Sequence, residues 1–240
     1  MKKYQVNLTK GVLLEHTAHH IHVRFNRPTQ IVSSAVLNGG AVKADHILNL
    51  NVRDQYNKGL KVQQRPDLSL AQYCRNRCWS GTTVGLMTAA SMDSFRMVQA
   101  TEQGVEIFVL VTSGLSNARR AGDYAEYRRI GNPQYNPGTI NIICLTTAVL
   151  TQAAMIEAVI TATEAKTAAL QDLGIKSPAS EAPATGTGTD AIAIAGACGH
   201  GSIKVQYCGK HVIFGEILAK LVIEALTSSL HCEGEEASYF

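Results

Sequence analysis

The sequence predicts an α+β fold in a single domain, with one or more mainly antiparallel or mixed β-sheets packed against two long helices. Two observations support this prediction. Apolar runs of strand length recur between turn residues along most of the chain, and two long stretches, 150–174 and 212–230, repeat their apolar residues every three or four positions, as helices do. Strands and helices do not alternate regularly, which argues against repeated strand–helix–strand units.

The N-terminal part of the chain is expected to be rich in strands. Asn38–Gly40 contains two glycines and provides the backbone freedom for a tight turn or for close approach to a ligand. The polar segment 57–67 is expected to be a loop, and 68–77 a short helix. The predicted strands are 4–8, 11–16, 21–25, 30–37 and 47–52.

Compact apolar runs later in the chain predict buried central strands at 84–87, 105–111 and 139–145. Two further strands are expected at 191–195 and 203–207. The Ser/Ala/Pro-rich connector 178–183 that precedes them is too short to require a domain boundary.

Both predicted long helices carry an apolar stripe that we expect to face the core. Gly174 is expected to close the first helix. We expect residues 1–230 to form the domain and 231–240, which are acidic and lack periodicity, to form a C-terminal tail. The stripe of the first helix consists of Ile156, Val159, Ile160, Thr163, Thr167 and Leu170.

The composition indicates a folded, soluble chain. Its 22 basic and 19 acidic residues leave a net charge of +3, and 45% of the 240 residues are hydrophobic. This near balance of charge gives no electrostatic basis for binding nucleic acid. The apolar runs are shorter than the roughly 20 residues of a membrane-spanning helix, and the first residues lack the apolar segment of a signal peptide. We therefore expect no membrane span and a cytoplasmic location.

Patterns for nucleotides and metals are weak. Neither the P-loop pattern nor a complete dinucleotide-binding fingerprint is present. Cys74 and Cys78 are spaced as half a zinc site, but no second half follows. The segment 16–22 holds four histidines, and on a strand His20 and His22 share one face, so they supply a partial ligand set. We assign no metal and no cofactor, and we leave metal binding by these histidines open against a surface or hydrogen-bonded role.

The segment Ala184–Asp190 has the most unusual composition in the chain. Its alternating glycines expose backbone amides, while three threonine hydroxyls and one carboxylate are available to a ligand. Exposed amides stabilise an oxyanion, and a neighbouring carboxylate orients or deprotonates water. The alternative is a flexible turn that leads into a strand.

Two other segments carry candidate polar residues. Thr112 and Asn117 follow an apolar run, where they either line the mouth of a pocket or cap the next helix. Glu164 and Lys166 flank the apolar stripe of the first helix about 160° apart, because each residue advances about 100° around the axis. Each reaches towards a pocket or borders the core as a solvated charge.

Six segments, 33–40, 83–90, 111–118, 138–142, 163–166 and 184–190, occur in the order of the sequence blocks of one known family. Together they resemble the adenosylcobinamide amidohydrolase (CbiZ-type) family of corrinoid salvage enzymes. The resemblance implies hydrolysis of the amide between the aminopropanol arm and the corrin propionate side chain, giving adenosylcobyric acid and aminopropanol. It implies a corrinoid small molecule as the substrate, and it leaves a homo-oligomer open.

The resemblance also suggests roles for the candidate residues. In the first route Asp190 activates water, amides around Gly186 and Gly188 bind the oxyanion, and Glu164 or Lys166 protonates the leaving amine. In the second route Thr185, Thr187 or Ser34 is a covalent nucleophile, with or without self-cleavage before Thr139 or Thr185. The expected substrate-binding residues are Ser34, Asn38, Gly39, Thr112, Asn117, Thr139, Asn141, Thr185, Gly186 and Gly188.

Two other functions remain open at this point. The chain is alternatively a corrinoid-binding or carrier protein without catalytic activity, or an amidase for another bulky amide. Incubation with adenosylcobinamide distinguishes them, because only the proposed enzyme releases aminopropanol and leaves a new corrinoid carboxylate.

Overall fold

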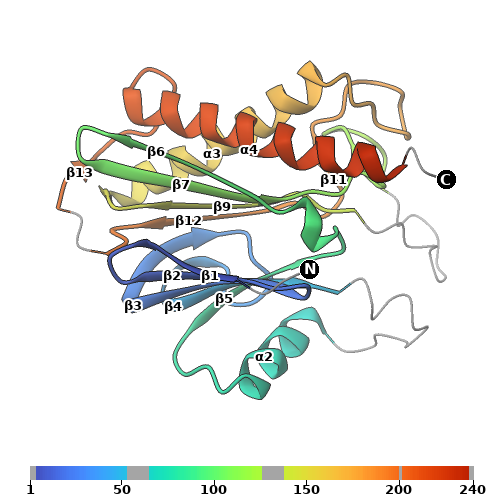
Figure 1. Cartoon of the computed structure of the whole chain (residues 1–240). Coiled ribbons are helices and arrows are strands. Elements are labelled where there is room, and N and C mark those ends of the chain that lie inside the picture. The colour runs from blue at the N-terminus through green and yellow to red at the C-terminus, as the bar shows by residue number, and fades with distance from the viewer. Residues whose placement is uncertain (1–3, 53–64, 126–137, 200–201, 238–240) are drawn as a thin grey trace.

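A mixed β-sheet folds over on itself into two facing layers, and helices cover both outer sides (Figure 1). The computed structural model describes residues 4–52, 65–125, 138–199 and 202–237, and nine strands within them form this sheet. The first layer contains β1 (Tyr4–Thr9), β2 (Val12–His16), β3 (His20–Ser33), β4 (Gly40–Asn51) and β5 (Thr83–Thr88). The second layer contains β6 (Arg96–Glu102), β7 (Val105–Thr112), β9 (Asn141–Thr146) and β12 (Ala191–Gly196).

Strand β3 connects the two layers. Its first half pairs with β2, and its second half pairs with β12 on the same edge, while β4 pairs along the other edge. The β3–β4 register shifts between Arg24 and Thr29, and Pro28 lies within this part of β3. A proline has no N–H for the ladder and favours such an irregularity. The strand order β1-β2-β3-β12-β9-β7-β6 therefore runs from one layer into the other. Among the described strands of this sheet, two pairs are parallel: β9–β12 within this order, and β4–β5 beside it.

Three α-helices occur in the described residues: α2 (Pro66–Asn76), α3 (Gln152–Asp172) and α4 (Ile213–Ala237). Helix α3 begins after Thr151, whose side chain accepts a hydrogen bond from the N–H of Ala154 at 3.1 Å. It ends before Gly174, which has a φ of +67°, as helix-terminating glycines often do. Helices α3 and α4 cover the second layer, and α2 lies on the outer side of the first (Figure 1).

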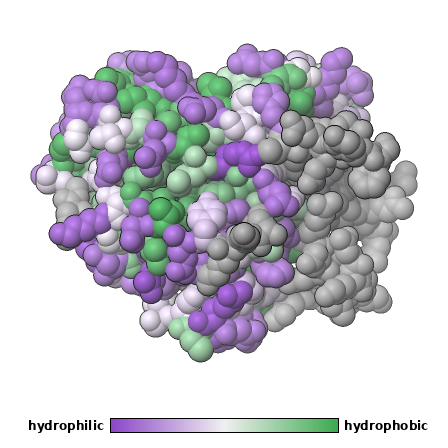
Figure 2. Space-filling view, in the orientation of Figure 1, coloured by the Kyte–Doolittle hydropathy of each residue, from purple (hydrophilic) through white to green (hydrophobic). Residues whose placement is uncertain are grey.

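Apolar side chains fill each interface between layers. Ile31 and Ile47 meet Leu110 and Ile143 between the two sheet layers. The outer face of the second layer packs against alanine-rich α3 and leucine-rich α4, and a smaller cluster lies under α2. Apolar residues also reach the surface in patches bordered by hydrophilic residues (Figure 2). None of the described helices combines the length and apolar character that crossing a bilayer requires.

The predicted single α+β domain with a mixed sheet agrees with this structure, but several element boundaries differ. The predicted strand 21–25 and the first part of the predicted strand 30–37 form the single bent strand β3, which ends at Ser33. Strand β4 begins at Gly40 rather than residue 47. The strand expected at 203–207 shrinks to β13 (Lys204–Val205), which pairs with β10 (Val149–Leu150). The predicted loop 57–67 lies mostly outside the described residues, and its last two residues begin α2. Helix α4 continues to Ala237 instead of ending near residue 230.

Strand β6 was not predicted from the sequence. It reads Arg-Met-Val-Gln-Ala-Thr-Glu, without a strict alternation of apolar and polar residues, and all seven residues are at least partly exposed. It lies at the end of the strand order, where it pairs only with β7 among the sheet strands. An edge strand needs fewer apolar residues, which explains why the sequence pattern was weak.

The predicted buried face of α3 is wrong for most of its residues, since Leu170 is the one member of the predicted stripe that is fully buried. Ile156 and Ile160 are 56% and 52% exposed, although both belong to the apolar stripe that was expected to face the core. The helix instead buries small residues, which allow close approach to the sheet and to α4. The alanines on this buried face are Ala154, Ala158, Ala162, Ala165 and Ala169.

Candidate active site

The segment Ala184–Asp190 is held at the end of the second layer. Within it β11 (Gly186–Thr187) pairs with β8 (Ala118–Arg119) in antiparallel register. Asp190 directly precedes β12, which runs parallel to β9, so its carboxylate lies next to the start of both strands. Gly188 and Thr189 form a turn that leads into β12, as the alternative expected, but the backbone of Gly186–Thr187 is paired with β8 and the Asp190 carboxylate is held by hydrogen bonds.

Four donors hold the Asp190 carboxylate. Oδ1 accepts from the N–H of Ile140 at 3.0 Å and from the hydroxyl of Thr187. Oδ2 accepts from the N–H of Thr187 at 3.0 Å and from the ammonium of Lys166. The Lys166 and Asp190 side chains are 8% and 11% exposed, so the ion pair is largely removed from water. A buried pair of this kind needs such hydrogen bonds to offset the loss of hydration.

Helix α3 delivers Lys166 to this position. Lys166 belongs to the alanine-lined buried face of the helix, which points it at Asp190. Glu164, two residues earlier, is 50% exposed and forms an ion pair with Lys210. The two residues therefore share the helix but not the site, and of this pair only Lys166 can deliver a proton beside Asp190.

Gly186 leaves the space that the Lys166–Asp190 pair occupies. A Cβ atom added to Gly186 would lie 2.3 Å from Asp190 Oδ2 and 2.6 Å from Lys166 Nζ. No side chain fits at this position without moving the ion pair. The absence of a Cβ atom at Gly186 is therefore required for the Lys166–Asp190 contact.

Gly186→Ala is accordingly expected to lower the free energy of unfolding by about 1–3 kcal/mol, because overpacking forces the buried pair to shift. Urea denaturation measures the change. Gly188→Ala is the matched comparison, since its added Cβ would come no closer than 3.4 Å to Asn117 Nδ2. Equal stability of the two variants would contradict the steric role of Gly186.

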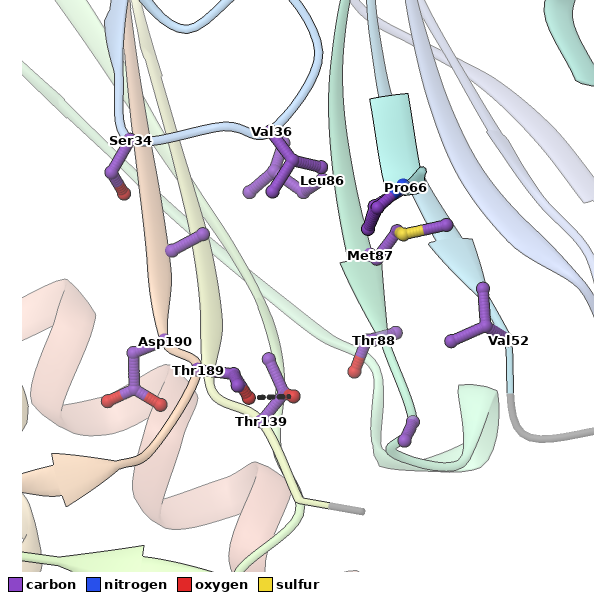
Figure 3. Close-up of a pocket in the computed structure, with 12 residues that line it drawn as sticks. Ser34, Val36, Val52, Pro66, Leu86, Met87, Thr88, Thr139, Thr189 and Asp190 are labelled. Carbon is purple, nitrogen blue, oxygen red and sulfur yellow. Dashed lines mark hydrogen bonds between the residues drawn. The ribbon is translucent and has the colours of Figure 1, made fainter. Parts of the chain in front are cut away.

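Asp190 lies at one end of a mainly apolar cavity of about 310 Å³, which we call the apolar cavity (Figure 3). The hydroxyls of Thr139 and Thr189 form a hydrogen bond of 2.8 Å beside Asp190. The Ser34 hydroxyl lies on the same side of the cavity as Asp190. Residues from β5, including Leu86 and Met87, line the opposite side. The full lining is Ser34, Val36, Val52, Pro66, Leu86, Met87, Thr88, Ala89, Thr139, Thr189, Asp190 and Ala191.

A second cavity of about 510 Å³ lies on the other side of the Ala184–Asp190 segment. We call it the cationic cavity, because its lining includes three basic side chains and one carboxylate. Asp190 lines both cavities. The lining consists of Arg119, Arg120, Ala121, Thr163, Lys166, Thr167, Thr185, Gly186, Thr187, Gly188 and Asp190.

The structure brings together many of the residues that the sequence singled out. Ser34 and Thr139 line the apolar cavity, and Lys166, Thr185, Gly186, Thr187 and Gly188 line the cationic cavity, with Asp190 between them. Thr189, the third hydroxyl of the Ala184–Asp190 segment, also lines the apolar cavity, whereas Arg119, Arg120 and Thr88 were not among the predicted site residues. The adjacent arginines just after Ser116-Asn117 were the available signal, because paired cations near a polar segment favour binding an anion.

Asn38 and Gly39 line neither cavity. Asn38 adopts a φ of +52° and donates from Nδ2 to the carbonyl of Thr83 at 2.8 Å. A Cβ on Gly39 would lie 2.2 Å from the carbonyl oxygen of Ala35. Both residues thus shape the turn between β3 and β4, and that turn brings Ser34 and Val36 to the apolar cavity.

Thr112 and Asn141 belong to a buried hydrogen-bond network. Asn49 donates to the Thr112 hydroxyl at 2.9 Å, and Asn141 donates both to Asn49 at 2.8 Å and to the carbonyl of Met87 at 2.8 Å. This network joins strands of the two layers below the site. Asn117 is also buried, and its side-chain oxygen faces Gly138 without a hydrogen-bond partner in the described part of the chain.

Two of the four histidines of 16–22, His20 and His22, belong to an aromatic cluster with Trp79 away from Asp190, whereas His16 packs against Phe95 and His19 is exposed. His22 Nε2 lies 3.1 Å from His46 Nδ1, and the His22 ring stacks on Trp79 with centroids 3.6 Å apart. His20 Nε2 lies 3.0 Å from a carboxylate oxygen of Glu15. Across residues 4–52, 65–125, 138–199 and 202–237, no three His, Cys, Asp or Glu side chains are grouped so as to hold a metal ion.

This cluster predicts a loss of stability in mild acid. Burial lowers the pKa of His20 to about 4 and that of His22 to about 3, from an ordinary value of 6.5. The unfolded chain therefore binds more protons below pH 6.5, so this stability is present above pH 6.5 and lost as the pH falls towards 3. Between pH 7.5 and pH 5 we expect a loss of about 2 kcal/mol for each histidine.

Urea unfolding followed by the fluorescence of Trp79, the single tryptophan, measures this slope. His22→Phe should remove its share of the pH dependence, whereas the control His19→Gln changes an exposed histidine and should leave it intact. If the free energy of unfolding of His22→Phe depends on pH as strongly as that of the unaltered chain, burial of His22 is not a source of the acid sensitivity.

Comparisons with known proteins agree with the sequence resemblance. The family model described as adenosylcobinamide amidohydrolase matches residues 5–238. An adenosylcobinamide amidohydrolase of Methanosarcina mazei is 28% identical over 209 residues, which cover 84% of this chain and 90% of that protein. An uncharacterized protein of Methanocaldococcus jannaschii is 37% identical over 159 residues; the match covers 60% of this chain and spans 61% of that relative's length.

Two solved structures match this chain with low sequence identity and with TM-scores below 0.5. A β-aminopeptidase from a Burkholderia species has a TM-score of 0.43 and 11% identity, with 93% of this chain and 80% of that chain covered. The L-aminopeptidase D-Ala-esterase/amidase of Ochrobactrum anthropi has a TM-score of 0.41 and 8% identity, with coverages of 95% and 81%.

Proposed function

Because this chain belongs to the adenosylcobinamide amidohydrolase family, we propose that it cleaves the aminopropanol amide of adenosylcobinamide in corrinoid salvage. The products are adenosylcobyric acid and aminopropanol. The observation that carries the proposal is the position of Asp190. Its carboxylate lies where the apolar and cationic cavities meet, in contact with a threonine hydroxyl and a lysine ammonium.

The two cavities suit different parts of this substrate. Both have volumes within the range of small-molecule sites, about 300–1,000 Å³. The apolar cavity offers apolar side chains to the corrin ring, and the hydroxyls of Ser34, Thr139 and Thr189 offer hydrogen bonds to its amide side arms. The aminopropanol arm then extends past Asp190 towards the cationic cavity.

Amide hydrolysis requires a nucleophile, donors for the oxyanion and a proton for the leaving amine. Each oxygen of the Asp190 carboxylate already accepts two hydrogen bonds. A water molecule would therefore have to displace one of these donors in order to reach Asp190. The Thr187 hydroxyl already donates to Asp190 Oδ1. This contact favours Thr187 as a covalent nucleophile with Asp190 as its base.

The ion pair also provides a path for the proton. Asp190 takes the proton of Thr187 as its oxygen attacks the amide carbon, and Lys166 gives a proton to the departing amine. Transfer of the proton from Asp190 to Lys166 restores the ion pair. Water then attacks the ester on Thr187, and Asp190 takes one proton from this water. Asp190 returns that proton to the Thr187 oxygen as the ester bond breaks, and the corrinoid acid that leaves loses the second water proton to solvent.

Backbone amides next to Thr187 are the proposed donors for the oxyanion. The Thr187 N–H is already bound to Asp190, so the N–H groups of Gly188 and Thr189 remain nearest along the chain. The Thr189 N–H donates to the Thr187 hydroxyl oxygen at an N···O distance of 3.5 Å, and both Gly188 and Thr189 are exposed. A tetrahedral oxyanion formed at Thr187 would therefore be close to these amides.

The direct test incubates the purified chain with adenosylcobinamide and identifies the products by mass spectrometry. Release of aminopropanol together with a corrinoid carboxylate supports the enzyme. A bound but unchanged corrinoid identifies a binding or carrier protein, and neither binding nor reaction indicates another substrate. The intact mass of the active protein decides self-cleavage, since a single full-length chain with activity excludes it.

A further inference from the structure

The cationic cavity has a composition that the hydrolysis of a neutral amide does not require. Arg119, Arg120 and Lys166 line it, and Asp190 is the single acidic residue among the described residues of the lining. The Asp190 carboxylate is already paired with Lys166, and Arg119 also interacts electrostatically with the Asp123 carboxylate outside the lining. The described lining thus contains three basic side chains and one carboxylate. The nearby Asp123 carboxylate is not part of the lining and accepts from the N–H of Arg120 at 2.8 Å and from Ser177 at 2.5 Å.

The other groups around this cavity are hydrogen-bond donors suited to an oxyanion. The Thr185 hydroxyl oxygen accepts from the N–H of Ala121 at 2.8 Å, which leaves its own hydrogen for another acceptor. One guanidinium nitrogen of Arg120 donates to the carbonyl of Pro183 at 3.0 Å, and this contact fixes the side chain at the cavity. Guanidinium groups and hydroxyls beside glycine backbone form a typical donor set for phosphate.

The geometry of the proposed reaction places the end of the aminopropanol arm in this cavity. If the corrin ring occupies the apolar cavity, the leaving amine lies on the Lys166 side of Thr187. The oxygen of the aminopropanol alcohol is three bonds from the amide nitrogen, and a phosphorus atom attached to it is four bonds away, or roughly 5 Å. A phosphate there would lie in the cavity that Arg119 and Arg120 line.

We infer that the cationic cavity is a phosphate subsite and that the chain prefers cobinamide whose aminopropanol arm carries a phosphate monoester. This inference rests on the proposed function for its placement of the arm. The ligand of the subsite is a phosphate oxyanion in either case, whether the phosphate is attached to the aminopropanol group or free in solution. Two experiments distinguish these two sources.

The first experiment measures binding without turnover. Inorganic phosphate is titrated into the full chain and followed by calorimetry, with ionic strength held constant by sodium chloride. Binding to the unaltered chain that weakens about tenfold in Arg120→Gln and recovers in Arg120→Lys supports the subsite. Lys210→Gln is the matched control, because Lys210 pairs with Glu164 and lines neither cavity. Absence of binding, or equal weakening in Lys210→Gln, overturns it.

The second experiment compares kcat/KM for two substrates, adenosylcobinamide and adenosylcobinamide whose aminopropanol group carries a phosphate monoester. A phosphorylated-to-unphosphorylated ratio of about ten or more that falls about tenfold in Arg120→Gln, but not in Lys210→Gln, supports an arm-borne phosphate. A ratio of one or less overturns the substrate preference, and phosphate binding in the first experiment then identifies free phosphate as the ligand. If neither corrinoid is hydrolysed, the proposed function fails, while the calorimetric titration still decides the subsite. Circular dichroism of each variant confirms that the fold is kept.

Discussion

Asp190→Asn is expected to lower kcat/KM for adenosylcobinamide by about a thousandfold or more. The asparagine side chain cannot take the proton of Thr187. Its NH₂ group would also face a donor, either Lys166 or Thr187, where the carboxylate now accepts from both. The variant therefore removes the base and the ion pair together, and steady-state kinetics with product detection by mass spectrometry measures the loss.

The control for this experiment is Glu216→Gln, which changes an exposed carboxylate paired with Lys220 on α4. It should leave kcat/KM within about twofold, since exposed ion pairs contribute little. Unfolding curves for both variants separate a catalytic effect from a loss of fold. Near-normal turnover by a folded Asp190→Asn protein would place the base elsewhere.

Thr187→Val is expected to lower kcat by about a thousandfold, because it removes the proposed nucleophile while keeping a side chain of similar shape. Thr187→Ser keeps a hydroxyl that can donate to Asp190 and should retain activity to within about tenfold. A rapid acid quench followed by mass spectrometry of the peptide containing residue 187 should detect the corrinoid ester in the unaltered chain.

Substantial turnover by Thr187→Val, without a corrinoid ester on the unaltered chain, would instead support direct activation of water by Asp190. The two routes thus give opposite results with the same protein and substrate. Thr185 provides a useful comparison, because its hydroxyl oxygen is bound to the N–H of Ala121 and does not contact Asp190 in the described structure.

The sequence singled out the segment that lines the two cavities of the structure. Exposed glycine backbone, hydroxyls and a carboxylate within Ala184–Asp190 pointed to it, and Lys166 was a candidate partner. The structure adds the contact between Lys166 and Asp190, which periodicity could not show. The apolar stripe indicated the wrong face of α3, because small residues rather than Ile156 and Ile160 form the packed surface. Without the correct buried face, Glu164 and Lys166 could not be distinguished as candidate proton donors from the sequence.

Long-range pairing explains the other differences. Nothing local to residues 20–33 shows that one strand will pair with β2 along one part and with β12 along another. Thr112 and Asn141 look like ligand-binding residues when only their polarity and their place at strand ends are known. Their partner, Asn49, comes from the other layer and is visible only once the sheet has closed.

The pairing of β3 with β12 has a consequence for synthesis on the ribosome. Ser33 lies opposite Ala193, so the two strands that close the sheet are encoded far apart. A nascent chain cannot complete this contact until most of the polypeptide has emerged, and pairings of such large sequence separation form slowly. Asp190 immediately precedes the late strand, so catalytic competence should arise at the end of folding, and stalled shorter chains should expose the unpaired half of β3 to chaperones.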